Sequence, residues 1–293
     1  MTLHEDEFHI DISVVADLIA AQMPEWSELP LRRLDTAGTV NFTYRLGSDM
    51  LVRLPRAPAY SRGPLRESRW LPIFEPLLPL QISNHLALGT GTDAYPSPWS
   101  VLSWIPGENA TPRTLSDLTD AAMRLGEFVV ALRGVGTAGG PGNHRRGHGL
   151  ERKHADALRY ILQLPDDIDR SAVRELWEAC LLAPTWDGPP LWFHGDLHSG
   201  NLLALDGELT AVIDFEDCGV GDPASDLIAA WWLFDESSRD TFLGIIDPDD
   251  ASLRRGMGWA LYMCIAGIPY YQHSNPEFAG MARTALNQIL GTR

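Results

Sequence analysis

The chain has 293 residues, of which 45% are hydrophobic and 21% charged, a composition typical of a folded protein with one large or two medium domains. Its 39 Asp and Glu against 23 Lys and Arg give a net charge of −16, which disfavours nucleic acid and anionic membranes as partners and favours either cationic ligands or simple solubility. No stretch is apolar enough over about 18 residues to span a membrane, and the acidic start lacks the apolar segment of a secretory signal.

The three cysteines are far apart in the sequence and odd in number: Cys180, Cys218 and Cys264. Such cysteines favour neither a disulfide framework nor a zinc site, and they fit a reducing compartment. We therefore expect a cytoplasmic protein.

The first hundred residues alternate short strands with helices. Apolar residues at helical spacing predict a helix over residues 10–23. The period then changes, and strands are expected at 31–34, 41–46, 50–54, 86–89 and 99–105, with a helix over 64–71 that ends before Pro72. The turn at 36–40 has a single glycine, so it is either an ordinary hairpin or a loop whose amides approach a phosphate.

A single charge, Arg53, lies in an otherwise apolar strand, and Glu67 follows on the next helix. Arg53 is either an edge-strand residue or a functional cation that faces a cleft. A cation on a strand paired with a carboxylate on a helix is one way to hold a phosphate-binding group still. The alternative for Glu67 is a surface carboxylate with ordinary helical neighbours.

After the Pro106-Gly107 break, the pattern is mainly helical, which places a domain boundary at 104–108. Helices are expected at 114–135, 151–163, 169–182, 223–235 and 249–272. The glycine-rich segment 136–149 is expected to be a flexible loop, and with Arg152, Lys153 and His154 it is the basic part of the chain. It either contacts an anion or substrate or is a solvated loop.

The most informative stretch is 191–226. A short strand runs into Gly195-Asp196, and a second strand at 202–205 returns through the hairpin signal Asp206-Gly207. Such a hairpin brings Asp214 near Asn201 and Asp196. Oxygen ligands from Asn201 and Asp214 suit magnesium, which leaves Asp196 to accept a proton from a hydroxyl.

A different metal is possible at the same stretch. His194, Asp196 and His198 form a His-x-Asp-x-His string that suits zinc in a hydrolase. Gly195 and Gly200 interrupt the strand that would align these ligands, and the alternative for His194 is a buried histidine that supports the loop.

Two further groups of residues lie towards the C-terminus. Asp222, before Pro223, is a good helix N-cap, and Asp226 can accept backbone amides, so both are expected to support the catalytic loop. Aromatic residues and the acidic pair Asp235 and Glu236 could hold a cationic or sugar-bearing ligand, or could be core aromatics beside a solvated helix end.

Three motifs together resemble the aminoglycoside phosphotransferase family: His194-Gly-Asp196-Leu-His-Ser-Gly-Asn201, Ile213-Asp214-Phe-Glu and Gly221-Asp-Pro-Ala-Ser-Asp226. Segments 38–47, 50–55 and 98–105 also look like its nucleotide-loop hairpin, third strand and hinge. The resemblance implies an α+β, protein-kinase-like fold of two lobes. A small antiparallel-sheet lobe (1–105) would bind nucleotide, and a larger, mainly helical lobe (106–293) would carry catalysis and substrate binding.

The resemblance also implies site residues. Asp196 would be the catalytic base, Asn201 and Asp214 would bind Mg²⁺, and Arg53 with Glu67 would hold the phosphates. The remaining expected nucleotide contacts are Thr39, Val40, Ser103, Ile105 and Ile213, and the expected substrate contacts are Asp196, Glu216, Asp235 and Glu236. Arginine replaces the lysine of many members at position 53, and it can still make a bidentate contact with phosphate or with Glu67.

These observations predict a magnesium-dependent kinase that transfers the γ-phosphoryl group of ATP or GTP to a hydroxyl of a small molecule, such as a cationic aminoglycoside antibiotic. The alternatives are a kinase of a macrolide, another antibiotic or a metabolite, a catalytically silent ligand-binding protein of the same fold, and the zinc hydrolase.

Overall fold

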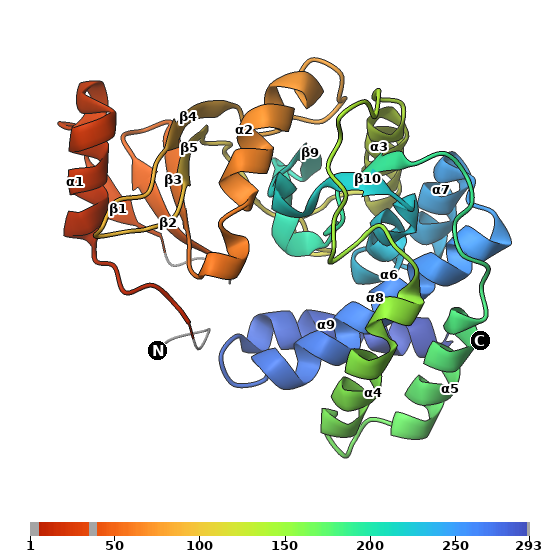
Figure 1. Ribbon diagram of the computed structural model, residues 1–293. Helices are drawn as coiled ribbons and strands as arrows, with labels where there is room; N and C mark the ends of the chain where they lie inside the picture. The colour runs from red at the N-terminus through yellow and green to blue at the C-terminus, as the bar shows by residue number, and fades with distance from the viewer. Residues whose placement is uncertain (1–5, 35–39, 292–293) are drawn as a thin grey trace. The chain divides into compact units, whose positions relative to one another are not determined.

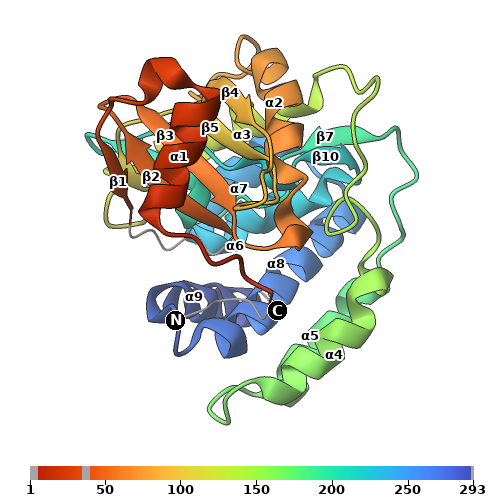
Figure 2. The same cartoon turned by 60° about the vertical axis from the view of Figure 1, so that its left-hand side comes forward.

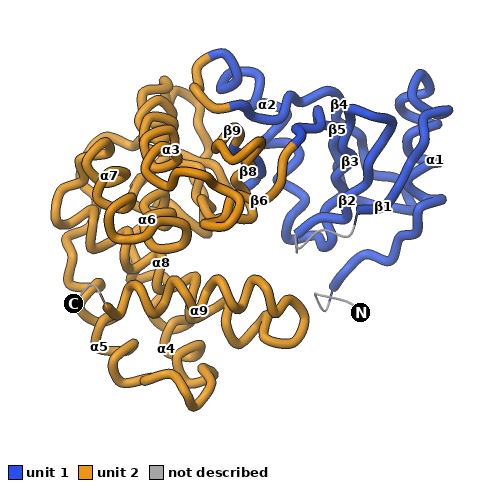
Figure 3. Tube along the Cα trace, turned by 180° about the vertical axis from the view of Figure 1, so that it is seen from behind, with its two compact units in different colours: residues 1–76, 81–106, 212–216 blue, residues 77–80, 107–211, 217–293 orange. Residues whose placement is uncertain are grey.

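A computed structural model describes residues 6–34 and 40–291 of the chain (Figure 1). The chain forms two compact units (Figure 3). Unit 1 comprises residues 1–76, 81–106 and 212–216, and unit 2 comprises residues 77–80, 107–211 and 217–293. Residues 212–216, which carry Asp214, group with the first unit although they come late in the sequence.

Unit 1 is built on a five-stranded antiparallel sheet with the strand order β1-β2-β3-β5-β4. Its strands are β1 (Leu31–Arg33), β2 (Asn41–Leu46), β3 (Met50–Pro55), β4 (His85–Gly89) and β5 (Trp99–Ser103), and its helices are α1 (Ile12–Gln22) and α2 (Gly63–Phe74). The β2–β3 turn needs Gly47, whose φ is +60°.

A continuous apolar core joins α1 to the sheet. Val15, Leu18 and Ile19 on one side of α1 pack with buried residues of β2, β3 and β5, among them Val52 and Trp99. Figure 2 shows α1 lying across this face of the sheet. Helix α2 contacts β4 and β5. Strand β3 is a central strand that pairs with β2 and β5, so Arg53 is not an edge-strand residue. It is only 6% exposed.

Unit 2 is mainly helical. Its helices are α3 (Leu118–Arg133), α4 (His154–Gln163), α5 (Arg170–Leu181), α6 (Ala229–Trp232), α7 (Glu236–Ile246), α8 (Asp250–Tyr271) and α9 (Pro276–Gly291). Its short strands are β6 (Glu108–Asn109), β7 (Leu191–Phe193), β8 (Leu202–Leu205), β9 (Glu208–Val212) and β10 (Gly219–Gly221). Strands β6, β8 and β9 form one sheet, and β7 pairs with β10. The hairpin at Asp206-Gly207 forms as expected, with both residues at positive φ.

The α+β prediction, with an antiparallel sheet in one unit and helices in the other, is confirmed. Some element boundaries differ. Helix α2 continues past Pro72 to Phe74. Helix α3 begins at Leu118 because the Asp117 carboxylate caps the amides of Thr119 and Asp120. Helices α7 and α9 were not expected, and the helix predicted over 223–235 is a 3₁₀ turn followed by α6. No helix among the described residues is both long and apolar enough to cross a membrane.

Candidate functional site

The turn after β7 is fixed by a buried carboxylate. Asp226 is fully buried, and its two oxygens accept the backbone amides of His194 (2.9 Å) and Gly195 (2.7 Å). Gly195 has a φ of +88°, and a Cβ atom there would lie 2.9 Å from the Asp217 carbonyl oxygen. Only glycine fits such a position. Together these contacts determine where the next residue, Asp196, directs its side chain.

The two carboxylate oxygens of Asp196 have different surroundings. Oδ2 accepts a hydrogen bond from Asn201 Nδ2 at 2.9 Å and lies 3.3 Å from His198 Nε2. Oδ1 lies 3.8 Å from Arg146 Nη2, within ion-pair distance but beyond a hydrogen bond. The side chain remains 27% exposed. One oxygen is therefore held by the protein, while the other can receive a ligand hydroxyl.

The charge state of Asp196 follows from these neighbours. Burial raises its pKa, but the proximity and hydrogen bond of His198 and the charge of Arg146 outweigh burial, so the pKa is well below the usual range for aspartate. Asp196 is therefore an anion at neutral pH, and an anion can orient a hydroxyl and accept its proton.

Aromatic side chains surround the other side of His198. Its ring lies 5.9 Å from that of Trp232 and 5.5 Å from that of Phe278, and Phe278 lies 4.8 Å from Tyr271. His198 Nδ1 accepts the Gly200 amide at 3.0 Å. We call His198, Trp232, Tyr271 and Phe278 the aromatic cluster. It brings helices α8 and α9 beside residues 195–201, the segment called the catalytic loop below.

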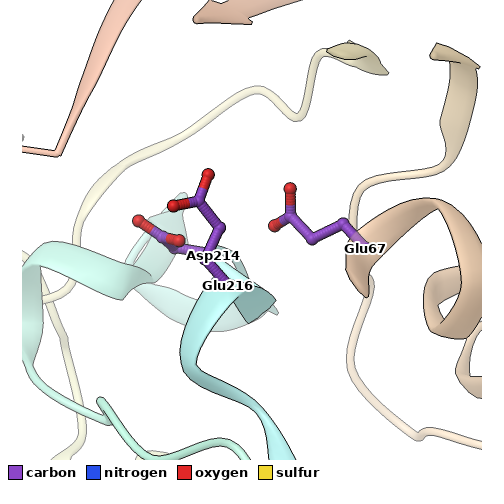
Figure 4. A group of neighbouring side chains, drawn as sticks. All are labelled: Glu67, Asp214 and Glu216. Carbon is purple, nitrogen blue, oxygen red and sulfur yellow. The ribbon is translucent and has the colours of Figure 1, made fainter. Parts of the chain in front are cut away.

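In unit 1, three carboxylates lie close together (Figure 4), and all three pair with one buried cation, Arg53. Arg53 Nη1 lies 3.0 Å from Glu67 Oε1, and Arg53 Nη2 lies 2.9 Å from Asp214 Oδ1 and 2.7 Å from Glu216 Oε1. Glu67 also accepts the Phe215 amide at 3.0 Å. Asp214 has a φ of +67°, and its side chain is 33% exposed. Figure 4 shows Glu67 reaching from α2 towards the other two carboxylates.

Three neighbours hold Glu216 in this cluster. Asn41 Nδ2 donates to Oε1 at 2.8 Å, and Arg66 Nη1 donates to the Glu216 carbonyl oxygen at 2.9 Å. A Cβ atom at Gly63 would lie 2.6 Å from Glu216 Cδ, so the absence of a side chain there makes room for the carboxylate. The sequence led us to expect Glu216 at the substrate; in the structure its carboxylate contacts Arg53.

The cluster carries more negative than positive charge, and the pKa values reflect this. Burial raises the pKa of Glu216 to about 8, although Arg53 acts in the opposite direction. Burial also raises the pKa of Glu67. Burial alone would lower the pKa of Arg53, but the charges of Asp214, Glu216 and Glu67 outweigh it and raise the pKa well above its ordinary value. Arg53 stays charged, and the surplus of carboxylates favours an additional cation.

The other expected nucleotide contacts, besides Arg53 and Glu67, are Thr39, Val40, Ile213, Ser103 and Ile105. Thr39 lies outside the described residues. The Val40 carbonyl oxygen accepts the Arg56 amide at 2.8 Å. Ile213 is half-buried and precedes Asp214.

The hinge segment is ordered by bonds to its neighbours. The Ser103 amide donates to the Asn84 carbonyl oxygen at 2.8 Å, and the Trp104 amide donates to the Asp49 carbonyl oxygen at 2.7 Å. Ile105 is buried. The Ser103 amide is therefore already engaged in a backbone hydrogen bond.

The remaining sequence-predicted residues serve the scaffold of unit 2. Asp222 is buried, accepts the Ala224 amide at 3.0 Å and pairs with Arg255 at 2.8 Å. Asp235 caps α7 by accepting the amide and hydroxyl of Ser238, and these bonds lower its pKa. Glu236 is exposed in the first turn of α7. The carboxylate of Asp235 is thus committed to the helix end.

Two groups of potential metal ligands can now be compared. Within the described residues, the group of histidine, cysteine or carboxylate side chains close enough to share an ion is Glu67, Asp214 and Glu216, with ligand atoms within 4.8 Å of one another. The His194, Asp196 and His198 string does not form such a group, and His194 Nδ1 and His198 Nδ1 each accept a backbone amide. This finding argues against the zinc hydrolase.

The magnesium ligands expected from the sequence fit a hard cation by their chemistry. Asn201 Nδ2 donates to the carbonyl oxygen and to Oδ2 of Asp196, both at 2.9 Å. The amide oxygen of Asn201 is therefore the atom that can bind a cation. Asp214 offers a partly exposed carboxylate oxygen. Both are oxygen donors of the kind that magnesium prefers.

Sequence reasoning missed Arg146, Asn41 and Arg255. Asn41 is the first residue of β2, and Arg255 on α8 pairs with Asp222. Arg146 lies in the glycine-rich segment that was expected to be flexible. The positive charge of this segment was the only sign in the sequence that it could have a role at the site. Side-chain contacts between residues this far apart leave no periodic pattern in a sequence.

Comparisons with known proteins identify the family and the fold of this chain. The model of the phosphotransferase enzyme family (APH) matches residues 32–259. The fold is similar to a GDP complex of wild-type aminoglycoside 2′-phosphotransferase-IIIa, with a TM-score of 0.72, 16% identity and coverage of 97% of this chain and 99% of that chain. It is also similar to macrolide 2′-phosphotransferase MphH from Brachybacterium faecium, with a TM-score of 0.61, 22% identity and coverage of 94% and 98%.

A third similar structure is a ternary complex of APH(2″)-IIa with streptomycin and ATP, with a TM-score of 0.61, 18% identity and coverage of 97% of each chain. No curated protein matches the sequence significantly. The family resemblance and the two-lobe fold read from the three motifs are confirmed.

Proposed function

The chain belongs to the phosphotransferase enzyme family, and from this premise we propose that it transfers the γ-phosphoryl group of ATP or GTP to a hydroxyl of a small molecule. The observation that carries the proposal is the arrangement at Asp196. Asn201 and His198 fix one of its oxygens, while the other lies in a partly exposed position. A positioned, ionised carboxylate with one oxygen left for a ligand is what orientation of an acceptor hydroxyl requires.

The roles of the other residues follow from their contacts. Arg53, held by Glu67 and Glu216, supplies the positive charge for the nucleotide phosphates, and a guanidinium can contact phosphate through two N–H groups. Asn201 and Asp214 would hold Mg²⁺. When bound, the metal neutralises charge on the phosphates of the donor. Asp226 and Asp222 keep the catalytic loop and the turn before α6 in place.

The acceptor we propose is an antibiotic with free hydroxyl groups. The net charge of −16 favours a cationic aminoglycoside. Three similar structures are aminoglycoside complexes, and two are macrolide phosphotransferases. The aromatic cluster beside His198 supports a macrolide as the second candidate, because aromatic faces pack well against a large apolar ring.

The test is nucleoside diphosphate release, measured with ATP and with GTP, across a panel of aminoglycosides, macrolides and hydroxylated metabolites. We expect turnover with one class and a loss of at least about 100-fold in Asp196→Ala, with nucleotide binding by calorimetry retained. If none of these acceptors is turned over while magnesium-dependent nucleotide binding is intact, phosphoryl transfer to them is refuted. That result would favour a silent binding protein. Wild-type turnover in Asp196→Ala would refute the role of Asp196.

A further inference from the structure

The glycine-rich segment before α4 is anchored in the structure, contrary to the expectation of a flexible loop. Asn143 Oδ1 accepts the amides of Arg145 (2.7 Å) and Arg146 (3.3 Å), and Asn143 Nδ2 donates to the Asp217 carbonyl oxygen at 2.6 Å. The Gly147 carbonyl oxygen accepts the Asp222 amide at 3.1 Å. The segment is thus tied, on both sides of Arg146, to Asp217 and Asp222, which flank β10.

The anchored backbone directs the Arg146 side chain into the protein, where it is 8% exposed. Its Nε donates to the Gly195 carbonyl oxygen at 3.0 Å, and its guanidinium lies 5.2 Å from the centre of the Trp259 ring. A buried charge is costly unless it is paired and hydrogen-bonded. The charged partner here is Asp196, with Nη2 at 3.8 Å from Oδ1.

The distances distinguish Arg146 from the other neighbours of Asp196. Asn201 binds Oδ2 directly, so that oxygen is committed. Arg146 attracts Oδ1 without a hydrogen bond, so the oxygen is held in place and still has a lone pair for an acceptor. At the same time the bond to the Gly195 carbonyl oxygen holds the backbone directly before Asp196.

We propose that Arg146 is a positioning residue for phosphoryl transfer, which anchors the catalytic loop through the Gly195 carbonyl and orients Oδ1 of Asp196 towards the acceptor hydroxyl. This inference rests on the proposed kinase function. The basic segment thereby has a role at the catalytic carboxylate. Its two adjacent arginines differ in function, because Arg145, unlike Arg146, is 38% exposed and pairs with Asp217.

The experiment compares Arg146→Ala and Arg146→Lys with Arg152→Ala, which removes the same charge from an exposed position of the same basic stretch. Displacement of a catalytic group by about 1 Å costs on the order of 100-fold. We expect kcat to fall about 10- to 100-fold in Arg146→Ala, with the KM for nucleotide within about twofold of wild type. Arg146→Lys should be intermediate, because an ammonium cannot reach both partners as a planar guanidinium does. Arg152→Ala should match wild type.

Added guanidinium should partly restore kcat in Arg146→Ala and leave Arg152→Ala unchanged. A purely structural role would lower stability and active fraction but would not be rescued in this way. Arg146→Ala with a kcat within twofold of wild type, or a loss confined to the KM for nucleotide, would overturn the proposal. If Arg146→Ala fails to fold, the same comparison is made with Arg146→Lys.

A second readout keeps this inference separate from the proposed function. Hydrogen exchange of the amides in segment 195–201 should accelerate in Arg146→Ala and not in Arg152→Ala, whether or not an acceptor is known. A wild-type chain without turnover would refute the kinase function alone. Unchanged exchange in segment 195–201 of Arg146→Ala would refute the anchoring of the catalytic loop.

Discussion

The buried carboxylate of Asp226 offers a sharp test of how the catalytic loop is built. It accepts the amides of His194 and Gly195 with one oxygen each, at 2.9 and 2.7 Å. The substitution Asp226→Asn preserves the shape of the side chain but turns one acceptor into an NH₂ group. That NH₂ group then faces a backbone N–H, and one buried amide loses its partner.

The magnitude follows from the two bonds. A hydrogen bond to a charged group contributes about 1.5–3 kcal/mol, and a buried amide left without a partner costs about 1–3 kcal/mol. Burial raises the pKa of Asp226, and the proximity of His194 and the two amide bonds act against that rise. Asparagine carries no charge, so the substitution removes part of this burial cost. We therefore expect Asp226→Asn to lose about 2–3 kcal/mol, and Asp226→Ala, which loses both bonds, about 3–5 kcal/mol.

Thermal unfolding and turnover measure the two consequences. For a unit of roughly 150–250 residues, 1 kcal/mol corresponds to about 2–4 °C, so Tm should fall by about 4–12 °C in Asp226→Asn. Folded Asp226→Asn should also lose kcat, because Gly195 and Asp196 are no longer fixed. The control is Asp240→Asn, which removes an exposed carboxylate from α7. An Asp226→Asn variant with the Tm and kcat of wild type would refute the assignment.

The remaining predictions concern the Arg53 cluster. Gly63→Ala should raise the KM for nucleotide severalfold, because the new Cβ would displace Glu216 from Arg53. The control is Gly244→Ala on α7, where a Cβ meets nothing within 4 Å; this substitution should stabilise the chain by about 0.5–1 kcal/mol. A Gly63→Ala enzyme with an unchanged KM would contradict the prediction. Because the folded-state pKa of Glu216 is raised to about 8 from 4.5, the folded protein binds the extra proton, and stability without nucleotide should decline as pH rises from about 5 to 8. The free energy of unfolding should decline by at most about 4 kcal/mol, and this decline should be absent in Glu216→Gln. Denaturation of both proteins at each pH measures it. Parallel curves of unfolding free energy against pH would argue against the raised pKa of Glu216.

Much of the fold could be predicted from local pattern. The strand at 41–46, most of the strand expected at 99–105, and the helices that became α1, α5 and α8 follow from apolar periodicity. Helices α7 and α9 were not predicted. The beginning of α3 was misplaced because Thr114, where the helix was expected to begin, lies in a separate turn in which its hydroxyl accepts the Thr111 amide at 2.8 Å.

The sequence by itself determined the residues whose partners are close along the chain. Asp196 and Asn201 are five residues apart and meet within one loop, and Asp222 caps the turn that begins at the next residue. Such contacts depend on local backbone geometry, which short motifs specify directly.

Only the tertiary structure decided which distant residues complete each group. Arg146 reaches the Gly195 carbonyl oxygen from 49 residues away, Glu216 meets Arg53 across 163 residues, and Asn41 meets Glu216 across 175. The pairing of β3 inside a sheet and the anchoring of the basic segment create these contacts. The physical reason is that a buried charge is stable only where packing brings a partner to it, and packing between distant segments depends on the whole chain.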